Sequence, residues 1–186
     1  IILRETETIV PFGPTPTPLP HSRDVQDVLL AALDGLYSTA YRLTGRTDIA
    51  EDLVQETARK AIQTATSLRD HRNVRAWIFK ILMNGIREQL RRKRLWQEVD
   101  LESVDADFVA TARSTAMDDV PGAVAKLAPP LRALILLIDV AEFTIGEAAA
   151  ILGIPPGTAA SRLARAHREL REILSPYRKS AEGGGA

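Results

Sequence analysis

Residues 143–166 of the chain, Phe143 to Ala166, have the sequence FTIGEAAAILGIPPGTAASRLARA. Thr144 and Glu147 stand at the spacing of a capping box, in which each side chain satisfies a free backbone N–H at a helix start. Gly153 suits the left-handed position that often ends a helix, and the prolines after it can open another helix. The stretch therefore predicts two helices joined by a tight turn, the pattern of a helix-turn-helix.

The second of these helices is predicted to be amphipathic. Apolar residues at helical spacing mark its buried stripe: Leu163, Ala166, Leu170 and Ile173. The residues outside that stripe are largely basic: Arg162, Arg165, Arg168 and Arg171. A solvated surface helix would look the same in this segment alone. The DNA-binding interpretation therefore depends on a second basic helix upstream.

That upstream helix is predicted from Val74 to about Trp96, with Asn73 as its N-cap. Its apolar stripe comprises Trp77, Ile78, Ile81, Leu82, Ile86 and Leu90. Its polar face is strongly basic, opposed mainly by Glu88, and attracts phosphates: Arg72, Arg75, Lys80, Arg87, Arg91, Arg92, Lys93 and Arg94. Trp77 and Phe79 at the start of this face could stack on an unpaired base, although Trp77 fits the core equally well.

Two further helices are predicted before it. Residues 24–44 repeat apolar side chains with a helical period, and Gly45 ends the pattern. Asp48 and Glu51 have the spacing of a second capping box and open a helix to about Ala65. The exposed side of this helix is acidic and polar: Asp48, Glu51, Asp52, Gln55 and Glu56. Complementing the helix dipole would by itself explain this charge.

Composition divides the chain into five parts. Residues 1–23 are a flexible leader whose prolines oppose a helix and favour extended chain. Residues 24–97 form a first helical domain, residues 98–119 an acidic linker, and residues 120–178 a second helical domain that contains the helix-turn-helix. Residues 179–186, with three consecutive glycines, predict a disordered tail. The predicted fold class is all-α, with two small helical domains joined by an acidic flexible linker.

Overall composition excludes several classes of function. The chain has 24 basic and 24 acidic residues, so its net charge is zero and its charge is segregated along the sequence. The absence of cysteine excludes disulfides and thiolate metal sites, and it suits a reducing cytoplasm. No apolar run approaches the roughly 20 residues of a membrane span. The three histidines are scattered and no Gly-rich phosphate loop follows a strand pattern, so the sequence predicts no enzyme, cofactor or metal.

With both basic helices placed, the chain resembles the sigma-70 family of RNA polymerase sigma factors in its small extracytoplasmic-function (ECF) type. In the first half the resemblance rests on Tyr41–Gly45 (YRLTG), Asp48–Glu56 (DIAEDLVQE) and Arg75–Ile81 (RAWIFKI). In the second half it rests on Leu127–Arg132 (LAPPLR) and on the stretch quoted first. It covers about residues 24–174, in the family's order and spacing.

The resemblance implies a non-catalytic promoter-recognition subunit of bacterial RNA polymerase. Sigma region 2 would bind the minus-10 element through Arg72, Asn73, Arg75, Trp77, Lys80, Asn84, Arg87, Arg91, Arg92 and Arg94. Sigma region 4 would bind the minus-35 element through Pro156, Thr158, Ala159, Ser161, Arg162 and Arg165. Core RNA polymerase would be contacted through Asp48, Glu51, Asp52, Gln55 and Glu56.

The resemblance also implies a cytoplasmic location and a path for the acidic linker through the polymerase channels. Promoter DNA and core RNA polymerase are the implied partners, and an anti-sigma factor is a further candidate.

Two other functions stay open on the residues alone. Ala159 and Ala160 replace a frequent Val-Lys pair of the family, while Met83 and His167 stand where basic residues are common. These changes would lower DNA affinity. A degenerate sigma-like decoy that binds an anti-sigma factor is therefore an alternative, and so is a free-standing helix-turn-helix repressor. Polymerase binding separates the repressor from the other two, and promoter-specific transcription separates the decoy from a working factor.

Overall fold

The computed structural model describes residues 22–65, 73–92 and 120–182. Every regular element within these ranges is helical, which confirms the predicted all-α class. The first half holds three helices: α1 (Ser22–Thr44), α2 (Thr47–Thr64) and α3 (Val74–Arg92). The second half holds α4 (Val120–Ala125), α5 (Pro129–Ile135), a π-helix (Leu136–Val140), α6 (Ile145–Leu152) and α7 (Pro156–Glu182).

Some predicted segments fall wholly or partly outside the described residues. These are most of the leader, the entire acidic linker and the end of the tail. Helix α1 begins at Ser22, inside the predicted leader, and α7 continues to Glu182, inside the predicted tail. The helical parts of the chain thus extend slightly beyond the predicted domain ends.

The first half is a three-helix unit in which each helix packs against the other two. Leu36, Ile78 and Leu82 are completely buried at its centre. Gly45 has a φ of 67°, a left-handed conformation that glycine adopts without a Cβ penalty. Its N–H donates to the carbonyl oxygen of Tyr41 at 2.7 Å. The prediction that this glycine ends the first helix is confirmed.

The start of α2 differs from the prediction. Its N-cap is Arg46, in extended backbone, and no side chain caps the helix. Asp48 is instead held by Arg46 in a two-bond ion pair, in which Arg46 Nε donates to Asp48 Oδ1 at 3.0 Å. The predicted capping box of Asp48 and Glu51 is therefore wrong, because the helix already begins at Thr47.

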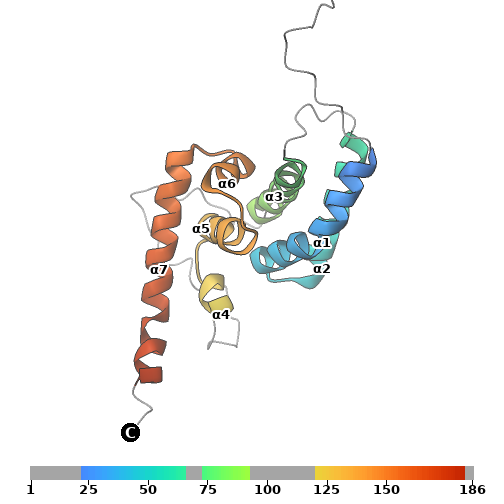
Figure 1. The fold of residues 1–186 in the computed structure, drawn as a ribbon. Coiled ribbons are helices and arrows are strands. Elements are labelled where there is room, and N and C mark those ends of the chain that lie inside the picture. The colour runs from blue at the N-terminus through green and yellow to red at the C-terminus, as the bar shows by residue number, and fades with distance from the viewer. Residues whose placement is uncertain (1–21, 66–72, 93–119, 183–186) are drawn as a thin grey trace, which may run out of the picture.

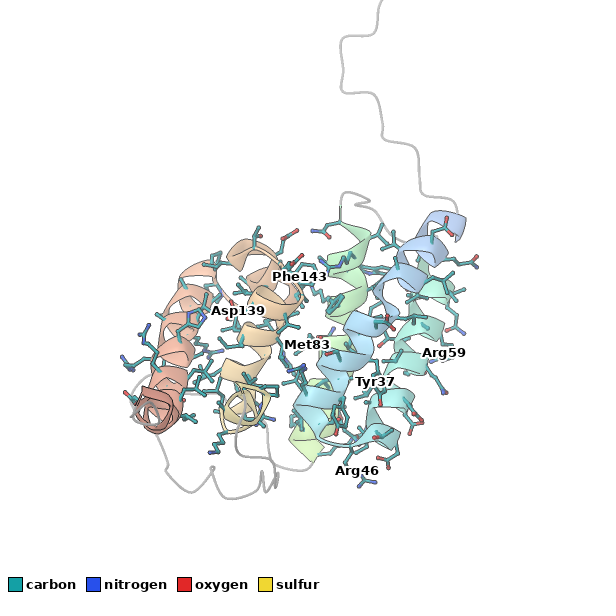
Figure 2. The ribbon with its side chains drawn as sticks, turned by 60° about the horizontal axis from the view of Figure 1, so that its bottom comes forward. Tyr37, Arg46, Arg59, Met83, Asp139 and Phe143 are labelled. Atoms are coloured by element: carbon teal, nitrogen blue, oxygen red, sulfur yellow. The ribbon has the colours of Figure 1, made fainter. Side chains whose placement is uncertain are left out.

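The second half packs α7 against α4, α5 and α6. The π-helix continues directly from α5, and the N–H of Ala141 donates five residues back, to the carbonyl oxygen of Leu136 at 2.9 Å. On the outside, His167 Nε2 of α7 lies 2.8 Å from Asp139 Oδ2 of the π-helix. Asp139 is labelled in Figure 2. The contact of His167 with Asp139 adds a polar link between α7 and the π-helix to the apolar packing of α7.

The two halves pack against each other through α3 and α6. Figure 1 shows α3 lying between α1 and α2 on one side and α5 and α6 on the other, with α7 on the outer edge. The rings of Phe79 and Phe143 meet edge to face, with their centroids 4.9 Å apart. Buried side chains from both halves form one continuous core. The sequence had indicated two domains separated by a linker, and the prediction did not include this packing.

Candidate nucleic-acid interface

The helix-turn-helix has the predicted local geometry at both ends of its first helix. Thr144 Oγ1 accepts from the N–H of Glu147 at 3.2 Å, and Glu147 Oε2 accepts from the N–H of Thr144 at 2.9 Å. At the other end, Gly153 has a φ of 63°. The N–H groups of Gly153 and Ile154 donate to the carbonyl oxygens of Ala150 and Ala149, which is a Schellman motif. The predicted capping box and glycine turn are both confirmed.

The helix that follows presents most of its predicted DNA contacts on one exposed side. Pro156 and Ser161 are exposed, and Thr158 and Arg162 are partly exposed. Arg165 is also partly exposed, but its Nε donates to Glu169 Oε1 at 2.8 Å. Ala159 differs from these residues.

Ala159 belongs to α7, and its side chain is completely buried on the inner face of that helix. Its methyl group contributes packing within the helix-turn-helix and does not face outward. The burial gives no support to a DNA contact at this position.

The start of α3 is fixed by Asn73, as predicted. Its side-chain Oδ1 accepts from the N–H of Ala76 at 2.9 Å, which satisfies a free donor of the first turn. The described residues of the predicted minus-10 set then divide between two sides of α3. One side faces α2 and the other faces the helix-turn-helix.

The side of α3 that faces α2 forms an open groove of about 580 Å³. Trp77, Asn84 and Arg92 of the predicted set line it, together with Lys60 and other residues of α2 and α3. Trp77 is partly exposed, so its ring is available along this groove. A partly exposed indole beside an amide and two cations suits the stacking of an unpaired base and the binding of its phosphate.

The other side of α3 contacts the helix-turn-helix through its polar residues. Arg75 Nη2 donates to the carbonyl oxygen of Ala141 at 2.7 Å, and its guanidinium lies over the ring of Phe143, 4.3 Å from the centroid. Arg87 donates to the carbonyl oxygen of Leu152, at the end of α6. Lys80 is exposed and lies apart from these contacts.

Phe79 does not take the place that the sequence suggested. It was expected at the start of the basic face, where its ring could stack on a base. The structure buries it completely, against Phe143 of the helix-turn-helix. The stacking prediction for Phe79 is therefore wrong, whereas Trp77 stays a candidate.

Arginines of both halves line one cavity of about 330 Å³. Arg87 and Arg91 come from α3 and Arg162 comes from α7, while the turn residues Gly153 and Ile154 complete part of the wall. Arg91 is exposed and binds Glu88, as does Arg92, whose Nε donates to Glu88 Oε1 at 3.0 Å. The ends of the two predicted DNA-binding surfaces therefore adjoin in this arrangement.

The predicted polymerase-binding residues lie along α2. Asp48, Glu51, Asp52 and Gln55 are exposed. Glu56 differs, because Arg59 Nε and Nη2 donate to its two carboxylate oxygens at 2.7 and 2.6 Å. Hydrogen bonds from Arg59 and Lys60 lower the pKa of Glu56 to about 2. The negative charge that α2 offers to a partner is therefore concentrated in its first turns.

Two polar residues with structural roles were missed by the sequence analysis. Arg132 is largely buried and donates to the carbonyl oxygens of Ala125, Leu127 and Arg42, the last of these in the first half. Burial lowers the pKa of Arg132 to about 10, so the guanidinium stays charged at neutral pH. The local sequence LAPPLR does not indicate whether the arginine binds carbonyl groups nearby in the chain or far from it.

Glu147 is the second such residue, because it does more than cap α6. It also accepts from Asn73 Nδ2 across the boundary between the two halves. Hydrogen bonds from Thr144 and Asn73, together with the charge of Arg75, hold the pKa of Glu147 below its usual value. The capping-box spacing revealed the first role but not the second.

Arg72 and Arg94 of the predicted minus-10 set lie outside the described part of the chain. Within it, no group of three or more His, Asp or Glu residues is placed to hold a metal ion. None of its helices is both long and apolar enough to cross a membrane.

Comparison with known protein families and sequences gives a consistent result. Residues 25–95 match sigma-70 region 2, and residues 118–170 match sigma-70, region 4. The ECF RNA polymerase sigma factor EcfG of Rhodopseudomonas palustris (strain TIE-1) is 33% identical over 174 residues, covering 90% of this chain and 93% of that protein. The ECF RNA polymerase sigma factor SigM of Mycobacterium tuberculosis is 32% identical over 134 residues, covering 72% and 68%.

Two solved structures are similar to the chain. One is the sigma factor RpoE of Bartonella quintana in complex with the anti-sigma factor NepR, with a TM-score of 0.65 and 35% identity over 82% of this chain and 98% of that chain. The other is CnrH in complex with the cytosolic domain of CnrY, with a TM-score of 0.62 over 84% and 90%. At 23% identity, the second likeness concerns the fold alone.

Proposed function

The chain belongs to the ECF type of the sigma-70 family, and from that premise we propose how its residues divide the work of promoter recognition. It is a sigma factor, which binds bacterial core RNA polymerase and directs promoter recognition and transcription initiation. Sigma factors are transcription regulators and not enzymes. The observation that carries the proposal is the presence of one basic helix in each half, α3 within region 2 and α7 within region 4.

We assign the minus-35 element to the exposed side of α7. The helix begins at Pro156, directly after the confirmed turn, so its first two turns can enter the major groove as in other helix-turn-helix proteins. Ser161 and Arg162 are the candidates for base contacts, since both are at least partly exposed and Arg can bind guanine through two hydrogen bonds. Pro156, Thr158 and Arg165 would position the helix. Ala159 is left out of this assignment because it is buried.

We assign the minus-10 element to α3. The groove against α2 is a concave site in which Trp77 could stack on an unpaired base, while Asn84 offers hydrogen bonds to a base edge. Arg91 and Arg92 are exposed at the end of α3 and would neutralise backbone phosphates. Further contacts along the helix would come from Asn73, Arg75, Lys80 and Arg87. The DNA contacts proposed for Arg72 and Arg94 rest only on the family resemblance.

We assign core polymerase to the exposed side of α2. Glu51, Asp52 and Gln55 form an acidic and polar surface on successive turns, suited to a basic or amide-rich partner helix. Asp48 and Glu56 are less available to polymerase. Asp48 already binds Arg46, the N-cap of α2, and Glu56 already binds Arg59 of α2. The acidic linker of residues 98–119 would run between the two halves through the polymerase channels, and the protein would act in the cytoplasm.

An anti-sigma factor is a further proposed partner. The similar RpoE structure is a complex with the anti-sigma factor NepR, and that chain is matched over 98% of its length. A likeness that includes both halves supports the same class of regulator for this chain. It does not indicate which residues such a regulator would contact.

Replacing Arg162 with alanine is expected to weaken binding of minus-35 duplex about tenfold, because a two-bond arginine contact to guanine contributes roughly 1–3 kcal/mol. The measurement is fluorescence anisotropy with a duplex that the wild-type chain selects from a random pool. Arg171→Ala is the matched control, since Arg171 is exposed further along α7, beyond the first turns. Unchanged affinity in Arg162→Ala would show that α7 does not bind DNA through this side.

A further inference from the structure

The cavity between α3 and the helix-turn-helix has the lining of a small-molecule site. Its described lining residues are of two kinds, basic and largely apolar: Arg87, Arg91 and Arg162, and Pro130, Leu152, Gly153 and Ile154. No Asp or Glu is among these described residues. The volume of about 330 Å³ falls within the usual range of ligand pockets, which combine apolar walls with a few convergent polar groups.

The positive charge around this cavity exceeds the negative charge beside it. Arg91 and Arg92 both bind Glu88, and one carboxylate neutralises only one of two guanidinium groups. Arg162 forms no hydrogen bond or ion pair with another described residue. Arg91 and Arg162 line the same cavity, where apolar walls strengthen the repulsion between their charges. An anion bound between them would relieve that repulsion.

One local feature opposes an anion, and Arg87 offsets it. Leu152 is the last residue of α6, and a helix C-terminus carries a negative partial charge of about half an elementary charge. Arg87 donates to the carbonyl oxygen of Leu152, so a full positive charge lies against this helix end. The part of Arg87 in the site is therefore to screen the end of α6. Arg91 and Arg162 are the groups that would contact a ligand.

We propose that this cavity binds a small organic phosphate, with the phosphoryl group between Arg91 and Arg162 and the organic part against the apolar wall. A phosphate monoester carries about −1.5 to −2 charges at pH 7, which matches two guanidinium charges. Guanidinium N–H groups bind phosphate oxygens in pairs, and the charges strengthen these bonds. This site goes beyond the proposed function, because its ligand is neither promoter DNA nor polymerase.

The size and the lining of the cavity favour an organic ligand over inorganic phosphate. A volume of about 330 Å³ has room for about ten waters at roughly 30 Å³ each, more than inorganic phosphate alone would displace. The apolar wall comes from Pro130, Leu152 and Ile154, so carbon atoms of a ligand would bury apolar surface against it. An organic phosphate is therefore expected to bind more tightly than inorganic phosphate.

Isothermal titration calorimetry of the full-length chain tests the site with inorganic phosphate, ribose 5-phosphate and adenosine monophosphate, and with sulfate as the control anion. Both organic phosphates should bind with dissociation constants at or below about 1 mM, and more tightly than inorganic phosphate. Tighter binding of adenosine monophosphate identifies a nucleotide, and equal or tighter binding of ribose 5-phosphate identifies a sugar phosphate. No binding up to about 10 mM, or equal binding of sulfate, would overturn the site.

Arg162→Ala is expected to weaken binding of the tighter organic phosphate at least about tenfold, because one charge-assisted contact is lost. The substitution breaks no hydrogen bond or ion pair to another described residue, so the fold should be kept. Arg171→Ala is the matched control, since it removes an arginine from the same helix, roughly 14 Å further along its axis. Equal affinity in Arg162→Ala and Arg171→Ala would contradict the proposed site.

Glu88→Gln is expected to have the opposite effect, a several-fold tighter binding of the same ligand. Its carboxylate competes with the ligand for Arg91, and the neutral amide releases that guanidinium. Glu172→Gln, exposed on α7, controls for the loss of one negative charge. A folding defect does not tighten binding, and equal affinity in these two variants would overturn the placement of the phosphoryl group. The titrations contain neither DNA nor polymerase, so their failure would leave the sigma-factor function standing.

Discussion

Replacing Phe79 with alanine is expected to lower the free energy of unfolding by about 3–5 kcal/mol, the usual cost of removing a buried phenylalanine. Phe79 of α3 is completely buried, between α1 and the segment that precedes α6. Its ring tip lies 3.4 Å from the position that a Cβ on Gly35 of α1 would occupy, and its edge contacts Phe143 of the second half. Truncation leaves a cavity that neither half can fill alone.

Thermal unfolding followed by circular dichroism measures this effect, and the midpoint should fall by about 10 °C. Leu30→Ala is the matched control, because Leu30 lies on α1 with 65% of its surface exposed and should change stability little. A midpoint within about 2 °C of wild type in Phe79→Ala would contradict the shared core. Unfolding in two separate steps would show instead that the halves are independent.

The second large effect is expected on promoter opening. Reversing Arg91 and Arg92 to glutamate should lower the rate of open-complex formation at least about 100-fold, because two charge-assisted phosphate contacts are replaced by repulsion. The logarithmic salt dependence of binding should also become shallower, by about 0.7 for each lost contact to a single strand. Both side chains are exposed, so the fold itself should tolerate the change.

Open-complex formation is followed with a fluorescent base in the minus-10 element, and polymerase binding is measured on the same samples. Lys126→Glu with Arg171→Glu removes the same net charge from surfaces outside the proposed contacts and serves as the control. Polymerase affinity should be unchanged in both variants. Parallel loss of polymerase binding and promoter opening would show that the end of α3 has a structural role.

Local features of the fold could be predicted from the sequence because their bonds join residues close together in the chain. The capping box of Thr144 and Glu147 spans three residues, and the Gly153 turn closes within five. The N-cap of α3 at Asn73 is equally local. The failure at Asp48 is local too: Arg46, two residues earlier, binds the carboxylate, and the helix begins earlier than predicted.

The packing of the two halves could not be predicted in the same way. Arg87 and the carbonyl oxygen of Leu152 are 65 residues apart, and the acidic linker lies between them in sequence. A signal was nevertheless present in α3. Phe79 and Met83, four residues apart, lie outside the apolar stripe predicted for this helix, and both are completely buried. Phe79 contacts Phe143 of the second half. A helix with two apolar sides requires cover on both, and here the helix-turn-helix supplies the second cover.

The same arrangement explains why the predicted minus-10 residues did not come together as one surface. Helical spacing alone places Trp77, Asn84 and Arg92 toward α2 and places Arg75 and Arg87 toward the other side of α3. The residue types alone, basic or aromatic, do not show which side of α3 is covered by another element. The element that covers each side, which only the fold reveals, decides which residues remain exposed in this arrangement of the two halves.

The most direct test of the account is in vitro transcription with bacterial core polymerase and a library of genomic promoter fragments. Discrete transcription start sites are expected to appear only when this protein is added, and to disappear when Arg91 and Arg92 are reversed to glutamate. Polymerase binding without any protein-dependent start site would contradict the sigma-factor account and favour the decoy alternative.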